Sequence, residues 1–135
     1  MLSVKFGNTD IIDTNSYPLS LFQNNQEPKL TFTKFKDSYY CIMIIDKDAP
    51  NKTNPINKYF LHWLIVNNNE EIIKYMAPSP PKNSGPHRYY VCVYKQNERI
   101  RDIKIDKRQK FSPKDFKQKY GLNMGFCKMF ITESI

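Results

Sequence analysis

The sequence lacks the features that would assign the protein to several common classes. It has no apolar run approaching about 18 residues, which excludes a predicted membrane-spanning helix. Its three cysteines, Cys41, Cys92 and Cys127, are odd in number, widely spaced and without a CxxC pair. This pattern excludes a disulfide framework and a zinc knuckle. Because apolar residues flank each cysteine, we expect all three to be reduced and buried.

The N-terminal residues also lack the apolar segment and the small-residue cleavage site of a secretory signal. Together with reduced cysteines, this favours a cytoplasmic protein. The chain has 135 residues, of which 40% are apolar and 14% aromatic. That length and composition predict a single domain over residues 1–135 with a core of its own.

Positive charge exceeds negative charge and is concentrated in one segment. The net charge is +8, and the range Arg99–Lys119 contains nine basic and three acidic residues. Such a segment favours acidic partners, including phospholipid headgroups, phosphoproteins and nucleic acid, and could form a peripheral membrane contact. The alternative is a solvated basic surface without a partner.

Strand patterns dominate the chain and predict a mostly β fold, either a sandwich or a barrel. The run YYCIMII is typical of a central strand buried on both faces. The range Ala77–Pro86 contains four prolines and a glycine and is expected to be irregular. The predicted strands are Lys29–Lys34, Tyr39–Ile45, Phe60–Asn67, Glu70–Tyr75, Tyr89–Gln96 and Phe126–Thr132.

One helix is predicted near the C-terminal end. Ser112 is a candidate N-cap, Pro113 suits the first helical position, and Gly121 can end the helix in the left-handed conformation. Phe116 and Tyr120 are four residues apart, so both are expected to pack inward.

Polar residues with chemical potential lie at the ends of buried strands. Asp46 and Asp48 follow one strand, and if strand geometry persists they share a face, which would raise the pKa of at least one carboxyl group. His62 and His87, the only histidines, begin two other buried strands. Each alone could be structural, but together they predict a polar pocket within apolar walls.

Two segments resemble the signatures of the phosphatidylethanolamine-binding protein family. DKDAPNKTNPINKYFLHWLIVN is similar to the first, and GPHRYYVCVYKQ is similar to the second. RQKFSPKDFKQKYGL resembles the segment that precedes the family's last strand. The resemblance extends over about Phe32–Thr132 and is weaker before it.

The resemblance implies a large central antiparallel sheet flanked by a smaller one, with one or two short helices. It implies a non-catalytic regulator that binds phosphate or a phosphorylethanolamine headgroup, with no cofactor and no metal. A kinase or another signalling protein is the implied partner. The ligand-binding residues that it implies are Asp46, Asp48, His62, His87, Phe60, Tyr75, Ser79, Pro80 and Tyr89.

The chemistry of these groups fits an anion. Histidine N–H groups can donate to a phosphate, and nearby aspartates would hold the imidazoles protonated.

The sequence departs from the family pattern at several positions. Lys47 stands where the family has a proline between the aspartates, and Phe60 stands where it has Trp or Tyr. The sequence stops at Ile135 without the family's C-terminal helix, which predicts a more open site. A short chain rich in Asn, Lys and Ile suits a viral member, acting in the host cytoplasm.

Two other functions compete with this prediction. The Asp/His cluster could serve a metal-dependent or acid/base hydrolase, although no Ser or Cys lies beside the histidines in a recognisable nucleophile motif. The basic segment could bind nucleic acid. It does not interleave aromatic and basic residues on a strand, so nucleic acid is not the expected partner.

Overall fold

The computed structural model describes residues 1–123 and 125–135 and confirms a mostly β architecture. Strands β4, β7 and β8 are the longest, and one α-helix and one 3-10 helix complete the fold. In chain order the elements are β1 (Leu2–Phe6), β2 (Thr9–Asp10), η1 (Leu19–Phe22), β3 (Lys29–Phe32), β4 (Tyr39–Asp46), β5 (Phe60–Val66), β6 (Glu70–Ile73), β7 (His87–Gln96), α1 (Pro113–Tyr120) and β8 (Leu122–Thr132).

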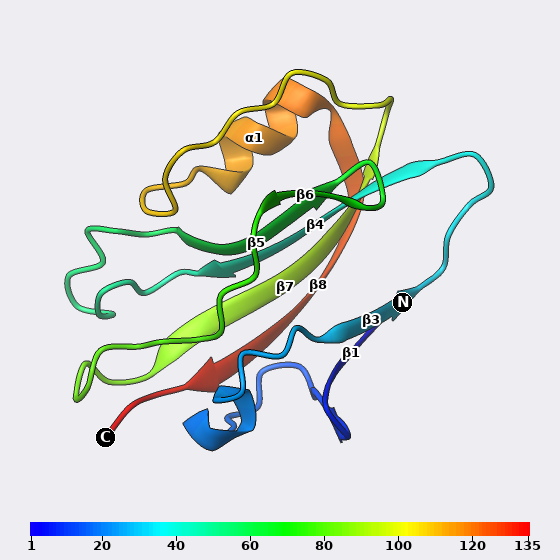
Figure 1. Ribbon diagram of the computed structural model, residues 1–135. Coiled ribbons are helices and arrows are strands. Elements are labelled where there is room, and N and C mark those ends of the chain that lie inside the picture. The colour runs from blue at the N-terminus through cyan, green and yellow to red at the C-terminus, as the bar shows by residue number, and fades with distance from the viewer.

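The strands form two antiparallel sheets. The larger has the order β6-β5-β4-β7-β8, and the smaller has the order β2-β1-β3. Figure 1 shows α1 on one side of the larger sheet and the smaller sheet with η1 on the other. The predicted arrangement of a large sheet flanked by a small one is therefore confirmed.

The N-terminal elements were not predicted from the sequence. In β1, Leu2, Val4 and Phe6 alternate with polar residues and are 5%, 1% and 2% exposed. This two-residue period is a strand signal that the sequence interpretation passed over. The last strand also begins earlier than predicted, at Leu122 instead of Phe126, because its pairing with β7 extends to Gln96.

Both faces of the larger sheet are buried, as the apolar runs predict. On one face, Phe6 and Phe22 of the N-terminal elements pack with Phe130 of β8, and the ring centroids of Phe22 and Phe130 lie 4.9 Å apart. On the other face, Met43 of β4 packs in the core that contains Phe116 of α1. Because side chains alternate between the two faces of a strand, β4 and β7 each contribute residues to both cores.

The signals for α1 are confirmed. The Ser112 side chain accepts a hydrogen bond from the Asp115 backbone N–H at 3.2 Å, and Gly121 ends the helix at φ 63°. Phe116 is buried, and the centroid of its ring lies 4.8 Å from that of Tyr120. Within the described residues, neither helix has the length and apolar character needed to cross a bilayer.

The cysteine prediction is correct for one residue and wrong for two. Cys41 is free and buried, and burial raises the pKa of its thiol to about 12. Cys92 of β7 and Cys127 of β8 form a disulfide. Their register makes them direct neighbours across the two strands, with Cα atoms 4.1 Å apart. Sequence spacing alone did not reveal this pairing.

A segment near the N-terminus covers part of the outer edge of β8. Thr14 N–H donates to the Met129 carbonyl at 2.7 Å, and the Ile131 N–H donates to the Asn15 carbonyl at 3.0 Å. The Asp13 carboxylate accepts from the Met129 N–H at 2.9 Å. The first part of the chain is thus attached to its last strand.

Candidate functional site

The predicted site residues converge where β4 ends and β5 and β7 begin. Antiparallel pairing places Asp46 opposite Phe60 on one side and opposite Tyr89 on the other. A cavity of about 150 Å³ lies at this end of the sheet, and we call it the histidine pocket. It is lined by Asp46, Ala49, Pro50, Asn57, Phe60, His62, Ser79, Pro81 and His87.

A β-bulge brings His62 into the pocket. Ile44 pairs with Trp63 and Ile45 pairs with Leu61, so His62 is the extra residue on β5. Bulges bend a strand locally and redirect a side chain, and they are common beside functional sites. Trp63 and Leu61 consequently pack in different cores, while His62 lines the cavity.

Asp46 and His87 form a buried hydrogen-bonded pair at the base of the pocket. His87 Nδ1 lies 2.7 Å from Asp46 Oδ2, and the two residues are 0% and 3% exposed. The other carboxylate oxygen accepts from the Asp48 N–H at 2.8 Å. Every polar atom of this carboxylate therefore has a partner within the fold, as a buried charge requires.

Ser84 occupies the remaining nitrogen of His87. Its Oγ lies 2.9 Å from His87 Nε2 and 2.6 Å from the Pro81 carbonyl oxygen. A carbonyl can only accept, so the single hydroxyl hydrogen of Ser84 is directed at Pro81. Nε2 of His87 must then donate to Ser84, which makes His87 a donor through both ring nitrogens.

The two aspartates do not share a face, which corrects the sequence prediction. The strand ends at Asp46, and Asp48 lies in the following turn with its carboxylate directed at Arg88. Arg88 Nε and Nη2 donate to it at 2.8 and 2.7 Å. Burial by itself would raise the pKa of Asp48, but the hydrogen bonds from Arg88 outweigh it and hold that pKa below the usual range.

His62 is neutral, which corrects the expectation that aspartates keep both imidazoles protonated. Its burial lowers the pKa to about 4, despite the opposing effects of the Met76 carbonyl and Asp46. Nδ1–H donates to the Met76 carbonyl at 2.7 Å. Among the described residues nothing hydrogen-bonds to Nε2, so this nitrogen is a free acceptor. The pocket thus contains one donor histidine and one acceptor histidine.

The other predicted neighbours divide into three groups. Phe60 and Ser79 line the cavity. Tyr89 supports it, since its ring centroid lies 5.4 Å from that of His62. Burial and the nearby Asp46 carboxylate raise the pKa of Tyr89, so its hydroxyl is neutral. Tyr75 packs on Trp63 instead, and neither it nor Asp48 nor Pro80 lines the cavity.

Sequence reasoning missed five residues of the site. Ala49 and Pro50 belong to the DKDAP motif, so their place in the motif was an available signal. Asn57 and Pro81 lie in irregular segments, where no periodicity indicates which side chains face the pocket. Ser84 precedes His87 by three residues and contacts its Nε2, although it belongs to no recognisable nucleophile motif.

The geometry bears on the alternative functions. Within the part of the chain that is described, no three His, Cys, Asp or Glu side chains converge as a metal site would require. The basic segment contributes Arg108, whose guanidinium donates to the carbonyls of Leu61, His62 and Lys74 at 3.0, 3.3 and 2.6 Å. This arginine supports the strand that carries His62.

Comparison with a family of known proteins gives a match along most of the chain. The sequence model described as "Phosphatidylethanolamine-binding protein" matches residues 3–70 and 67–124. The putative odorant-binding protein A5 of Drosophila melanogaster is 36% identical over 109 residues, covering 74% of this chain and 50% of that protein.

A viral relative and a solved structure extend the comparison. The phosphatidylethanolamine-binding protein homolog R644 of Acanthamoeba polyphaga mimivirus is 51% identical over 49 residues, covering 36% of this chain and 34% of that protein. The carboxypeptidase Y inhibitor, solved in complex with its cognate proteinase, superimposes with a TM-score of 0.87 at 21% identity. That match covers 99% of this chain and 83% of the inhibitor and establishes the fold. The chain spans half the length of the fly relative and about a third of the viral one.

Proposed function

Because this chain belongs to the phosphatidylethanolamine-binding protein family, we propose that it is a non-catalytic binding protein whose histidine pocket holds a phosphate-bearing group. The observation that carries the proposal is the pair of histidines with opposite roles around one cavity. His87 donates through both ring nitrogens, whereas His62 offers an unpaired Nε2 lone pair. A guest that both accepts and donates hydrogen bonds satisfies this pair.

A phosphomonoester monoanion has these properties. Its charged oxygen can replace Ser84 as the acceptor for His87, and its P–OH group can donate to Nε2 of His62. A phosphodiester headgroup has no P–OH group, but the ammonium group of ethanolamine supplies the missing donor. The nearby Asp46 carboxylate disfavours a second negative charge on the guest.

The size of the pocket limits what can enter. Its volume of about 150 Å³ is below the roughly 300–1,000 Å³ of sites for drug-sized ligands. A headgroup fits, while acyl chains would remain outside. Pro50, Pro81 and Phe60 provide apolar surface at its walls.

Calorimetric titration with phosphorylethanolamine tests the proposal, and we expect a dissociation constant between about 1 mM and 1 μM. His87→Ala would leave the buried Asp46 without its partner, so His87→Gln is the better variant because it retains volume and a donor. Its affinity should fall at least about tenfold. Ser79→Phe should block the entrance, with Lys82→Phe as the matched control at an exposed position outside the lining. Equal affinities for all four proteins would refute the site.

The pH dependence separates the two kinds of headgroup. The second ionisation of a phosphomonoester has a pKa of about 6. Binding of glycerol 3-phosphate, a monoester without an ammonium group, should weaken as pH rises through that value, because the dianion loses the P–OH donor and is repelled by Asp46. Glycerophosphoethanolamine, a diester, should bind with little change over the same range. Binding of glycerol 3-phosphate that is equally strong at high pH would contradict the acceptor role of His62.

A second candidate function has one observation in its favour. Ser84, His87 and Asp46 are connected in the order of a Ser–His–Asp triad, at 2.9 and 2.7 Å. A triad needs the serine hydroxyl to donate to the histidine, whereas here it is directed at Pro81. We therefore favour binding over hydrolysis. Covalent labelling by a fluorophosphonate that is lost in Ser84→Ala would reverse this preference.

We also propose partners of two kinds. A signalling protein such as a kinase, or a proteinase as in the complex of the inhibitor with the same fold, would contact the rim of the pocket. The basic segment Arg99–Lys119 would attract an anionic membrane surface, which positions a headgroup for binding. Sedimentation with vesicles that contain or lack phosphatidylserine tests the membrane contact, and no difference between them would refute it.

A further inference from the structure

A second cleft lies on the opposite face of the larger sheet, beside α1. It has a volume of about 220 Å³, and we call it the tyrosine cleft. Its lining includes Tyr59, Tyr90, Tyr94, Lys47, Lys117 and the Cys92–Cys127 disulfide. We propose that the tyrosine cleft binds a small aromatic anion, namely a planar ring that carries a phosphate group.

Alternation along β7 separates the two sites. His87 and Tyr89 point to the face with the histidine pocket, whereas Tyr90, Cys92 and Tyr94 point to the face covered by α1. Of the described residues, none lines both cavities. A ligand in the tyrosine cleft therefore makes contacts that do not depend on the histidines.

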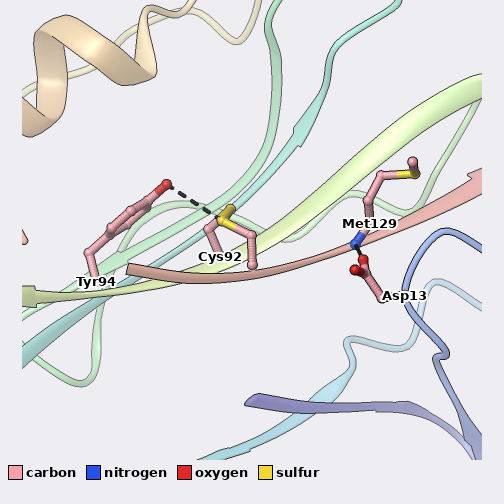
Figure 2. The surroundings of a disulfide bond; sticks show 5 residues. Asp13, Cys92, Tyr94 and Met129 are labelled. Carbon is pink, nitrogen blue, oxygen red and sulfur yellow. Dashed lines mark hydrogen bonds between the residues drawn. A yellow bond between two sulfur atoms is a disulfide. The ribbon is translucent and has the colours of Figure 1, made fainter. Parts of the chain in front are cut away.

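The ring of Tyr94 is fixed in place as one wall of the cleft. It lies directly over Gly125 of β8, where a Cβ atom would overlap Cε1 and Cδ1 of the ring. An aromatic side chain that covers a glycine on the neighbouring strand is a known stabilising arrangement in sheets. The Tyr94 hydroxyl lies 3.6 Å from Cys127 Sγ, and Figure 2 shows it directed at the disulfide. The residue is 9% exposed, so the ring is held on several sides.

Positive charge lies at the aromatic walls. Lys47 Nζ is 6.0 Å from the centroid of Tyr90, and Lys117 Nζ is 5.1 Å from that of Tyr94. No acidic residue is among the residues that line the cleft, and within the described residues neither lysine forms an ion pair. Pro113, at the N-terminal end of α1, also lines it, so the positive end of the helix dipole adds to the same charge. Asp115 is in the first turn of α1 but is exposed and outside the lining.

These features select the ligand class. Tyrosine faces stack on a planar ring, and two ammonium groups without carboxylate partners attract a phosphate dianion. The volume is below that of sites for drug-sized ligands, so a single ring with its anionic group fits better than an acyl chain. The aryl phosphate group is that of a phosphotyrosine side chain. A nucleoside monophosphate also combines a planar ring with a phosphate, but there the phosphate is an ester of the ribose and not of the ring.

Titration with phenyl phosphate, followed by calorimetry and by NMR of the tyrosine and histidine rings, tests the proposal. We expect shifts in Tyr59, Tyr90 and Tyr94 resonances and binding about tenfold tighter than that of inorganic phosphate. The double variant Lys47→Gln/Lys117→Gln should lose at least about tenfold in affinity, with Lys29→Gln/Lys36→Gln as the matched control. Both controls are exposed lysines outside the cleft.

Gly125→Ala provides an independent check, because the added methyl group must displace the Tyr94 ring. It should weaken phenyl phosphate binding without changing the affinity of the histidine pocket for phosphorylethanolamine. O-phosphotyrosine and AMP, titrated in parallel, distinguish the two sources of the ligand. Shifts confined to the histidines, or equal affinity in the lysine double variant and its control, would overturn the proposal. Either result leaves the function proposed for the histidine pocket unaffected.

Discussion

The histidine pocket and the tyrosine cleft use the same strand, β7, in opposite ways. In the pocket, the carboxylate already has a partner, because Asp46 pairs with His87. In the cleft, Lys47 and Lys117 lie over aromatic rings, and among the described residues neither forms an ion pair. Charges at the pocket therefore contribute to the fold itself, whereas charges at the cleft are available to a ligand and contribute little to the fold. Substitutions at the two sites should separate these roles.

The largest effect is expected for Asp46→Ala in the pocket. It removes the partner of a fully buried histidine and the acceptor of the Asp48 N–H. Breaking a buried pair in this way costs about 3–5 kcal/mol in the free energy of unfolding. Urea unfolding measures it. Lys117→Gln in the cleft should stay within about 0.5 kcal/mol of the wild type, and similar losses for both variants would contradict the contrast.

The disulfide is the one strong covalent contribution on the cleft side. Its two cysteines are 35 residues apart in sequence. Replacing them by Cys92→Ala/Cys127→Ser should reduce the free energy of unfolding by about 2–4 kcal/mol. Binding of phenyl phosphate should weaken, since both residues line the cleft, while binding of phosphorylethanolamine should be retained. Loss of binding in the pocket instead would show that the two sites are coupled.

The neutral His62 makes stability depend on pH. The pKa of His62 is about 4 when folded against a usual 6.5, so the unfolded chain binds more protons between these values. Stability contributed by the neutral ring is therefore present above about pH 6.5 and is lost on acidification toward pH 4. The loss reaches up to roughly 3 kcal/mol.

His62→Gln is the variant that isolates this effect, because it cannot titrate. Its free energy of unfolding should change less than that of the wild type between these two pH values. The salt bridge of Asp48 is lost only in more acidic solution, since its pKa is lowered. Parallel curves for wild type and variant would assign the pH dependence to other groups.

A smaller loss of stability than for Asp46 or the disulfide is expected at the N-cap of α1, the helix that carries Lys117. Ser112→Ala removes the acceptor of the Asp115 N–H and should cost about 1 kcal/mol. Thermal unfolding measures the loss. We expect a small decrease in phenyl phosphate affinity and none in phosphorylethanolamine affinity. Thr53→Ala, at an exposed loop position, is the control for a comparable side-chain truncation.

The sequence predicted the elements better than it predicted the details of the site. Long apolar runs and helix-capping residues placed β4, β5, β7 and α1 correctly, since these signals are local. The convergence of Asp46, His62 and His87 also followed from strand ends that meet in an antiparallel sheet. The bulge at His62 could not be predicted, because it depends on the register between β4 and β5. The disulfide could not be predicted either, because it depends on the register between β7 and β8.

Asp48 illustrates a second limit of prediction from sequence, namely contacts between residues that are distant along the chain. It lies two positions after Asp46, and continued strand geometry would have placed both carboxylates on one face. The strand ends between them, and Arg88 binds Asp48 from another part of the chain. A charge partner 40 positions away in sequence has no local signal. The prediction that His62 is protonated was also wrong. Burial lowers the pKa of this histidine, and burial depends on parts of the chain that are distant in sequence.

The attachment of Asp13, Thr14 and Asn15 to β8 has a consequence for biosynthesis. Asp13 accepts a hydrogen bond from a residue 116 positions later in the chain. During translation, this segment must therefore wait until β8 has left the ribosome before it finds its partner. Until then Phe6 of β1 lacks the Phe130 ring against which it packs, so this part of the core forms only after β8 has been made.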